Sequence, residues 1–160
     1  MLSIDLSKNK KICYVASSGG HWEELMCISP LFSEFNSVFI TEEGGQASDS
    51  NLSPLYLVPQ INRKEKLFFF HFISLFKKTL KIIKMEKPDY IVTTGALIAF
   101  PFCLVGKVFG AKIIYLESFA RIYSGSLTGK LCYPLADYFL IQWESLQRKY
   151  PKAVYVGGIF

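Results

Sequence analysis

The sequence predicts an α/β fold in which a mostly parallel sheet is covered by helices on both faces. Short apolar runs alternate with segments of helical pattern along the whole chain. These runs show no polar alternation, which is typical of strands buried on both faces. The chain has 160 residues, of which 51% are hydrophobic and 19% charged. This length and composition suit one domain, residues 1–160, with a sizeable core.

Seven apolar runs are predicted to be the strands. In chain order they are KICYVA (11–16), SVFIT (37–41), LYLVP (55–59), DYIVTT (89–94), KIIYL (112–116), YFLI (138–141) and AVYV (153–156). Because helices separate most of them, the economical arrangement is a parallel sheet with right-handed connections. The fold class that follows is a Rossmann-like sheet with helices on both faces.

The helices are predicted between these runs, at 21–35, 64–87, 96–109, 126–136 and 144–150. Pro88 ends the second of them, since a residue before proline disfavours the helical region. Pro101 must lie in the first turn of the third or kink it. Gly110 is a plausible C-terminal cap for that helix. The polar, Gly- and Ser-rich stretch 42–53 predicts a loop.

The first loop predicted to carry chemistry reads Ser17-Ser18-Gly19-Gly20-His21 and follows the strand at 11–16. Ligands of parallel α/β sheets bind at the carboxyl ends of the strands, where loops meet helix N-termini. Paired glycines let the backbone adopt positive φ and approach a ligand closely. A histidine here is a candidate general base near neutral pH. The alternative is an ordinary tight turn with a polar residue at the helix start.

Two further loops are expected at the same edge. Thr93-Thr94-Gly95-Ala96 lies at the end of the strand predicted at 89–94, and its hydroxyls either bind a phosphate or sugar or merely cap a helix. Glu117 directly follows the strand at 112–116, so its carboxylate is expected to be exposed at the binding edge. Arg121 lies four residues further on and either holds a phosphate or forms a structural pair with Glu117.

A dinucleotide site is disfavoured by the sequence. The G-x-G-x-x-G fingerprint is absent, because Gly19 and Gly20 stand alone. Glu42 lies roughly 20 residues downstream, near the place of a ribose-binding acid, but this is half of a motif. The chain also lacks a D-x-D motif. We therefore expect no nicotinamide or other cofactor and no bound metal ion.

The segment 63–87 is both basic and aromatic. It holds eight of the 18 basic residues and two acidic ones, a local net charge of +6 in a chain of formal net charge +5. Its apolar run at 67–76 is too short to span a bilayer, which needs about 20 residues. A helical projection places a mixed set on one face: Leu67, Phe70, Lys77, Lys78, Lys81 and Lys84. This pattern predicts an interfacial helix on anionic lipid, with a core helix and a solvated lysine face as the alternative.

Other partners and compartments are disfavoured. The basic segment offers aliphatic and phenylalanine surface without side chains that read bases, so no nucleic-acid partner is expected. The four cysteines, Cys13, Cys27, Cys103 and Cys132, form no C-x-x-C pair and have apolar neighbours. We expect them to be buried free thiols, which favours a cytoplasmic setting. No signal-peptide core precedes the first strand.

Three segments together resemble a known family: ASSGGHWEELM at 16–26, DYIVTTGA at 89–96 and the run at 115–157 that begins YLESFAR. They are similar to the membrane subunit of the split N-acetylglucosaminyltransferase of dolichol-linked oligosaccharide synthesis, and to its bacterial capsule and exopolysaccharide relatives. The most specific part is ESFAR followed by TGKLCYPLAD and QWE. The resemblance covers about residues 11–158.

The resemblance implies the N-terminal half of a GT-B glycosyltransferase that is split over two polypeptides. This half would dock on the membrane and bind a polyprenyl-diphosphate-linked saccharide, while a soluble partner subunit would bind the nucleotide sugar. The transfer would be inverting, with His21 or Glu117 as the general base. The partner interface would include Gly158, Ile159 and Phe160. The expected acceptor-binding residues are Ser17, Ser18, Gly19, Gly20, Thr94, Gly95 and Arg121.

The resemblance also bears on location and activity. The eukaryotic subunit carries an N-terminal transmembrane anchor, which this chain is expected to lack. The helix at 64–87 or a partner would then hold it peripherally on the inner face of the cell membrane. Activity without the partner is expected to be weak or absent. Two alternatives stay open: a non-catalytic membrane scaffold that recruits the transferase, and a stand-alone nucleotide-binding enzyme.

Overall fold

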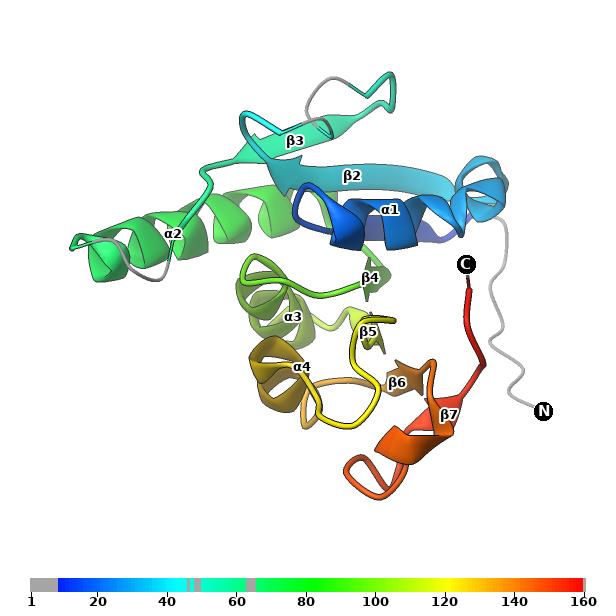
Figure 1. Cartoon of the computed structure of the whole chain (residues 1–160). Coiled ribbons are helices and arrows are strands. Elements are labelled where there is room, and N and C mark those ends of the chain that lie inside the picture. Colours follow the sequence, from blue (N-terminus) through cyan, green and yellow to red (C-terminus); the bar gives the residue numbers. More distant parts are fainter. Residues whose placement is uncertain (1–8, 46, 48–49, 63–65, 160) are drawn as a thin grey trace.

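The protein folds around one parallel sheet whose described strands pair in the order β3-β2-β1-β4-β5-β6-β7 (Figure 1). The computed structural model describes residues 9–45, 47, 50–62 and 66–159. The strands are β1 (Lys11–Val15), β2 (Asn36–Glu42), β3 (Leu55–Val58), β4 (Tyr90–Thr93), β5 (Lys112–Leu116), β6 (Tyr138–Ile141) and β7 (Val154–Tyr155). The predicted parallel sheet is confirmed, and each strand lies within about one residue of its expected bounds.

The order of the strands reverses between β1 and β4. From β1 the chain moves outward to β2 and β3, and α2 (Phe68–Glu86) then returns it to β4 on the other side of β1. Val15 pairs with Ile40 on one side and with Thr93 on the other, so these strands end level with one another. A reversal of this kind leaves a crevice at the carboxyl ends, where ligands of open α/β sheets bind.

The helices cover the two faces of the sheet unequally (Figure 1). One face carries α2, α3 (Ala99–Val108) and α4 (Leu127–Cys132), of which α2 contacts α3 and α3 contacts α4. Among the described residues, the helices on the other face are α1 (Gly20–Met26) and the 3-10 helix η1 (Ser29–Glu34). The 3-10 helix η3 (Glu144–Leu146) precedes β7.

Three of the predicted helices are much shorter in the structure, and the one predicted at 96–109 is α3, which begins only at Ala99. The single helix expected at 21–35 is α1 followed by η1, because Pro30 at the start of η1 has no N–H with which to continue an α-helix. The helix expected at 126–136 ends at Cys132, and the one expected at 144–150 is a single 3-10 turn. Pro101 lies in the first turn of α3, where a missing N–H is tolerated, as expected.

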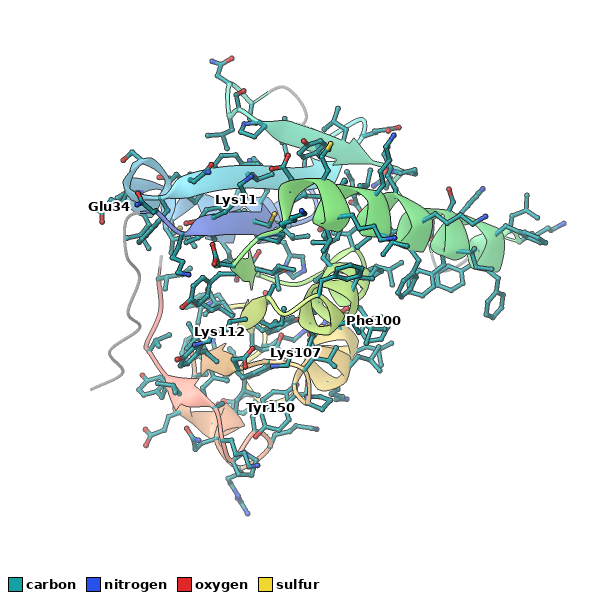
Figure 2. All side chains as sticks on the ribbon, turned by 180° about the vertical axis from the view of Figure 1, so that it is seen from behind. Lys11, Glu34, Phe100, Lys107, Lys112 and Tyr150 are labelled. Carbon is teal, nitrogen blue, oxygen red and sulfur yellow. The ribbon has the colours of Figure 1, made fainter. Side chains whose placement is uncertain are left out.

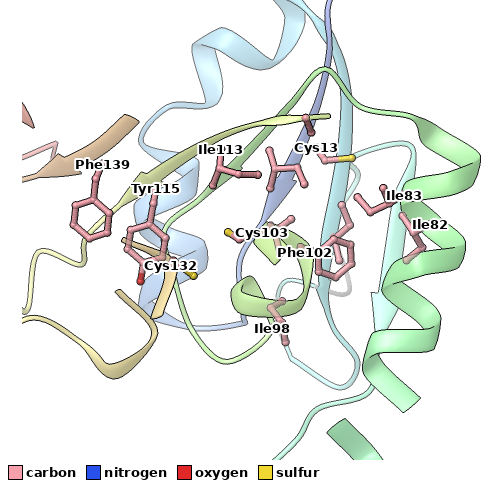
Figure 3. Packing of buried hydrophobic residues seen from close by; sticks show 14 of the residues in the cluster. Cys13, Ile82, Ile83, Ile98, Phe102, Cys103, Ile113, Tyr115, Cys132 and Phe139 are labelled. Atoms are coloured by element: carbon pink, nitrogen blue, oxygen red, sulfur yellow. The ribbon is translucent and has the colours of Figure 1, made fainter. Parts of the chain in front are cut away.

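The larger hydrophobic core lies between the sheet and α2, α3 and α4 (Figure 3). Within it Tyr115 of β5 stacks on Phe139 of β6 with ring centroids 4.9 Å apart. Gly106 lets α3 approach the sheet, because a Cβ atom there would overlap Ile91 of β4. Three of the four free cysteines are buried as predicted, whereas Cys27 is exposed at the end of α1.

The smaller core lies between the sheet and the short helices α1 and η1. Trp22 and Leu25 of α1 are buried there, and Phe32 packs on Tyr14 with ring centroids 4.6 Å apart. Because these two helices are short, part of this face stays uncovered. An apolar groove of about 260 Å³ remains over β4, β5 and β6. Its lining includes Val92, Ile114, Leu116, Leu140, Val156 and Ile159.

Two aspartates form hydrogen bonds at the amino edge of the sheet, where the strands begin; this edge is opposite the carboxyl edge. Asp89 accepts hydrogen bonds from the backbone N–H of Lys11 at 2.9 Å and from Lys10 Nζ at 2.9 Å. Asp137 repeats this arrangement with the N–H of Ile113 at 2.8 Å and with Lys107 Nζ at 2.7 Å. Figure 2 labels Lys11 and Lys112, the first residues of β1 and β5. The loops that follow β1, β4 and β5 lie at the carboxyl edge, so they take no part in these two aspartate clusters.

Candidate functional site

The three loops predicted to carry chemistry follow the neighbouring strands β1, β4 and β5. The pairing of Val15 with Thr93 and of Thr93 with Tyr115 brings their ends side by side. The loops therefore meet at the carboxyl edge, as the sequence predicted, and they do so where the strand order reverses. Within the described part of the chain, no cluster of His, Cys, Asp or Glu side chains there or elsewhere is arranged to hold a metal ion.

The β1–α1 loop turns sharply at its first glycine. Gly19 has φ of 85°, a left-handed conformation that favours glycine, and Gly20 begins α1 as an exposed residue. Ser17 is buried, whereas the hydroxyl of Ser18 is covered and has no hydrogen-bond partner among the described residues. A Cβ atom at Gly45 would overlap Ser18, so the β2–β3 loop lies directly against this turn.

His21 joins the first loop to the second. Its Nδ1 lies 2.7 Å from the backbone oxygen of Thr94, and the Thr94 hydroxyl donates to the backbone oxygen of His21 at 2.6 Å. A carbonyl oxygen only accepts hydrogen bonds, so Nδ1 must carry the proton. In the neutral ring Nε2 is then the unprotonated nitrogen. The side chain is 30% exposed, which leaves part of the ring accessible at the edge of the sheet.

The Thr93–Gly95 segment shapes the space that this ring occupies. The Thr93 hydroxyl accepts from the N–H of Gly95 at 3.1 Å, and Gly95 has φ of 111°. A Cβ atom on Gly95 would lie 3.2 Å from Cε1 of His21 and 2.9 Å from the Tyr115 hydroxyl. Thr94 is fully buried, and its hydroxyl bonds to the backbone oxygen of His21, so the hydroxyl faces no ligand in this structure.

Glu117 differs most from its prediction, because it is fully buried and not exposed at the edge. Its Oε1 accepts from the N–H of Ser118 at 3.1 Å. Its Oε2 accepts from the N–H of Ser126 and from the hydroxyl of Tyr150, both at 3.1 Å. A Cβ atom on Gly129 would overlap this carboxylate. The segment that follows β5 closes over Glu117, and the carboxylate anchors that segment from inside.

Arg121 lies on the exposed part of the same loop. Its backbone N–H donates to the Ser118 oxygen at 2.9 Å, which closes a turn. Over the residues that the structure describes, Arg121 forms no ion pair with Glu117, so the predicted structural pair is absent. The guanidinium therefore remains available for an anionic group at this edge.

Glu24 is part of the site, although the sequence did not single it out. Its Oε1 accepts from the N–H of Phe119 at 2.5 Å and from the Ser118 hydroxyl at 3.2 Å, which connects α1 to the β5–α4 loop. Its Oε2 lies 3.8 Å from Nδ1 of His21. Burial raises the pKa of Glu24, and the hydrogen bond from Phe119 is the largest opposing effect. The three-residue spacing from His21, which places both on one side of a helix, was the available signal.

The β6 end supports the β5–α4 loop and the C-terminal segment. Trp143 Nε1 donates to the Phe119 oxygen at 2.6 Å, and the two rings lie 4.9 Å apart. The side chain of Gln142 donates to the Glu117 oxygen and accepts from the N–H of Ile159, both at 3.1 Å. Gly158 lies against the ring of Phe119. Two of the three predicted interface residues thus adjoin the site, while Phe160 lies outside the described residues.

The helix expected at 64–87 is α2, which begins at Phe68; residues 63–65 lie outside the described part. Its start projects beyond the carboxyl edge of the sheet (Figure 1). Four apolar side chains are exposed there: Leu67 at 55%, Phe69 at 76%, Phe70 at 72% and Ile73 at 54%. The sequence did not predict Phe69 and Ile73 on the exposed face of this helix. Among the described residues, no helix has the length and hydropathy to cross a membrane.

The predicted lysines continue this exposed face toward the end of α2. Lys77, Lys81 and Lys84 are exposed, and Nζ of Lys84 lies 6.0 Å from the centre of the Phe109 ring. Lys78 lies at the margin of the face and donates to Glu43 Oε1 at 3.3 Å. The opposite side of α2 packs in the larger core. The helix is therefore amphipathic, with an apolar start and a basic end on its outer face.

The fold is shared with solved structures of other proteins. Solved structures with this fold include MurG of Acinetobacter baumannii, with a TM-score of 0.71 and 16% identity over 85% of this chain and 42% of that one. A UDP-N-acetylglucosamine 2-epimerase of Rickettsia bellii has a TM-score of 0.72 and 13% identity over 94% of this chain and 45% of that one. The fold is that of the Rossmann-like N-terminal domain of GT-B glycosyltransferases and epimerases. The chain spans less than half the length of these structures.

The family is identified from the sequence. The profile described as "Oligosaccharide biosynthesis protein Alg14 like" matches residues 65–159, and the chain belongs to this family. The human UDP-N-acetylglucosamine transferase subunit ALG14 is 29% identical over 177 aligned positions, which cover 92% of this chain and 82% of the human one. The Schizosaccharomyces pombe subunit is 45% identical over 44% of this chain and 36% of its own. The resemblance stated from the sequence motifs is confirmed.

Proposed function

We propose that this chain is the acceptor-binding, membrane-associating subunit of a two-component glycosyltransferase. It acts on a polyprenyl-diphosphate-linked saccharide in capsule or exopolysaccharide biosynthesis, and residues 1–160 form one acceptor-binding and membrane-docking domain. The relatives that carry the name of a UDP-N-acetylglucosamine transferase subunit support this assignment. Their name makes UDP-N-acetylglucosamine the first donor to test.

The observation that carries the proposal is the state of His21. With Nδ1 donating to Thr94, the free lone pair of the neutral ring is on Nε2, which is the state a general base requires. Nε2 takes the proton of the acceptor hydroxyl. At the same time the oxygen of that hydroxyl bonds to the anomeric carbon of the donor sugar. The nucleoside diphosphate leaves with the electron pair of the broken C–O bond. This single displacement inverts the configuration at that carbon.

Some of the other predicted residues of the edge bind the acceptor in this proposal, and the rest hold the site in shape. Gly19 and Gly20 lie beside His21 and have no side chains, so the diphosphate or first sugar can approach the backbone closely. The Ser18 hydroxyl has no hydrogen-bond partner among the described residues but is covered by the β2–β3 loop at Gly45, so it reaches the same group only when that loop moves. Arg121 supplies the positive charge. Thr94 and Glu117 hold His21 and the β5–α4 loop in place, and Ser17 and Gly95 shape the turns.

A second polypeptide supplies the donor site in this proposal. The C-terminal residues Gly158, Ile159 and Phe160 form part of the interface with it, next to the loop that Phe119 and Trp143 hold. Closure of the partner over the crevice would exclude water from the reacting groups, which strengthens every electrostatic interaction there. This explains why the chain alone is expected to transfer sugar weakly or not at all.

The outer face of α2 is assigned to the inner surface of the cell membrane. Its apolar start lies at the same edge of the sheet as the site loops, so a lipid-linked acceptor would reach His21 from the surface on which α2 rests. Insertion of an exposed Phe or Leu side chain contributes about 1–2 kcal/mol. Each lysine close to anionic lipid adds about 1 kcal/mol.

The deciding experiment is a transfer assay with UDP-N-acetylglucosamine and a polyprenyl-diphosphate-linked sugar, with and without the soluble partner. His21→Ala is expected to lower turnover at least tenfold without unfolding the chain. Glu23→Gln, a change at an exposed neighbour on α1, serves as the matched control. Full activity of this chain without a partner would contradict the two-component proposal.

Membrane docking is tested separately by sedimentation with vesicles that contain or lack anionic lipid. The triple change of Lys77, Lys81 and Lys84 to Glu is expected to abolish binding to anionic vesicles, and Phe69→Ser with Phe70→Ser to weaken binding to both kinds. The exposed Lys149→Glu, far from α2 in the sequence, is the control. If His21→Ala keeps full turnover while the lysine variant loses binding, the chain is a scaffold and not part of the catalytic site.

A further inference from the structure

We infer that Glu24 is a positioning residue for His21: while the Thr94 oxygen sets the tautomer of the ring, the buried carboxylate of Glu24 stabilises the charge that the ring gains when it takes a proton. This inference rests on the proposed function, because it gives Glu24 a role beside the proposed base. Glu24 belongs to α1 and would touch neither the acceptor nor the donor, so its effect would pass through His21.

The geometry separates the two oxygens of Glu24. Oε1 is held by two donors of the β5–α4 loop, Phe119 N–H at 2.5 Å and the Ser118 hydroxyl at 3.2 Å. Oε2 is buried, has no hydrogen-bond partner among the described residues, and lies 3.8 Å from His21 Nδ1. An acceptor left unpaired in the interior is costly, so its position needs a reason. The ring of His21 explains the position of Oε2, because the ring becomes positive when it takes a proton and then attracts this oxygen.

The other groups that face His21 do not replace this carboxylate. From β4, Thr94 offers only its neutral backbone oxygen. From β5, the Tyr115 hydroxyl lies near the ring across Gly95, and burial raises the pKa of Tyr115, so it stays neutral. Glu117 also contributes negative charge, and this raises the pKa of Glu24, but three donors already hold its carboxylate.

The two partners of Nδ1 therefore divide the work. The Thr94 oxygen accepts the Nδ1 proton at 2.7 Å and sets the tautomer. The carboxylate of Glu24 stands behind the same nitrogen at 3.8 Å and lowers the energy of the imidazolium that forms when Nε2 takes the proton of the acceptor hydroxyl. The proton stays on Nε2 until the product leaves, and Glu24 takes no proton itself.

The test is the titration of His21 by NMR in the full chain, which contains only one other histidine, the exposed His71. Glu24→Gln preserves the size of the side chain and an oxygen for Phe119 but removes the charge. We expect it to lower the titration midpoint of His21 by about one pH unit or more and to leave that of His71 unchanged. Glu23→Gln is the matched control and should shift neither. Ser118→Ala removes a donor to Glu24 without removing charge and should leave the midpoint of His21 near its wild-type value.

The transfer assay supplies a second reading in the reconstituted complex. Because the unprotonated ring is the active form, the rising limb of the pH profile of kcat/KM should move to lower pH in Glu24→Gln, and the plateau should fall on the order of tenfold. An unchanged His21 midpoint in a folded Glu24→Gln chain would overturn the inference. Full turnover by His21→Ala would instead overturn the proposed base, whatever the titration shows, so the two failures are distinguishable.

Discussion

Replacing Glu117 decides whether this carboxylate supports the structure or takes part in the chemistry. The side chain is fully buried, and three donors point at it: the N–H groups of Ser118 and Ser126 and the hydroxyl of Tyr150. Glu117→Ala removes the acceptor and leaves all three donors in the interior. We expect the chain to be strongly destabilised, since the segment between β5 and β7 closes around this group.

The size of the effect follows from the number of donors. A buried donor without a partner costs about 1–3 kcal/mol, and water that enters the space left by the carboxylate relieves part of it. Three donors then give a loss of about 4 kcal/mol in the free energy of unfolding. For a chain of this length that corresponds to a fall in Tm of about 8–16 °C. Tyr150→Phe removes one neutral donor from the cluster and should cost only about 1 kcal/mol.

The assay is urea unfolding of the wild type, Glu117→Ala, Tyr150→Phe and the control Glu144→Ala, which changes an exposed carboxylate of η3. With a slope of about 2 kcal/mol per molar urea, the midpoint of Glu117→Ala should fall by about 2 M. The reasoning is refuted if Glu117→Ala unfolds at the wild-type midpoint while transfer activity is lost. Such a result would make Glu117 a catalytic group and the hydrogen bonds around it dispensable.

Three further changes test other parts of the structure. Burial raises the pKa of Glu42 to about 7, whereas in the unfolded chain it is about 4.3, so the native state keeps a proton that the unfolded state has lost. The free energy of unfolding should therefore fall by about 2–3 kcal/mol as the pH rises from about 4.5 to about 7, and Glu42→Gln should abolish this dependence in urea titrations. Gly95→Ala places a Cβ atom 3.2 Å from Cε1 of His21 on a backbone with φ of 111°, so turnover in the transfer assay should fall at least tenfold while the fold, by circular dichroism, persists. Unchanged turnover would show that the ring can move without consequence. Gly106→Ala should cost about 1–3 kcal/mol in the same unfolding assay, because its Cβ atom would overlap Ile91, and a neutral effect would mean that α3 packs less closely on the sheet than described.

The strands and the location of the site were predictable because both follow from local patterns. Apolar runs without alternation identify buried parallel strands, and a loop that follows such a strand must lie at the carboxyl edge. That principle alone brought the loops of His21, Thr94 and Glu117 to one edge. It did not reveal that β1 and β4 are neighbours. Their pairing depends on α2, which connects β3 at one edge of the sheet to β4 beside β1.

Side-chain roles within the site were less predictable, because distant segments decide them. Glu117 is buried by Ser126 and Tyr150, which lie nine and 33 residues further along the chain. Glu24 follows His21 closely, but its importance depends on Phe119, 95 residues away. A pattern read along the chain shows which residues share a turn of helix. It does not show which loop will later cover them.

The pairing of β1 with β4 also affects the order in which the sheet forms. β1 pairs with β2 within the first quarter of the sequence, but its other partner follows only at Tyr90–Thr93. During synthesis one side of β1 stays without a partner until α2 and β4 have left the ribosome, and such late, distant pairing is slow and prone to aggregation. The contacts between His21 and Thr94 form across this late pairing of β1 with β4. Changes at these contacts are therefore expected to alter the yield of folded chain, which has to be measured apart from turnover in the transfer assay.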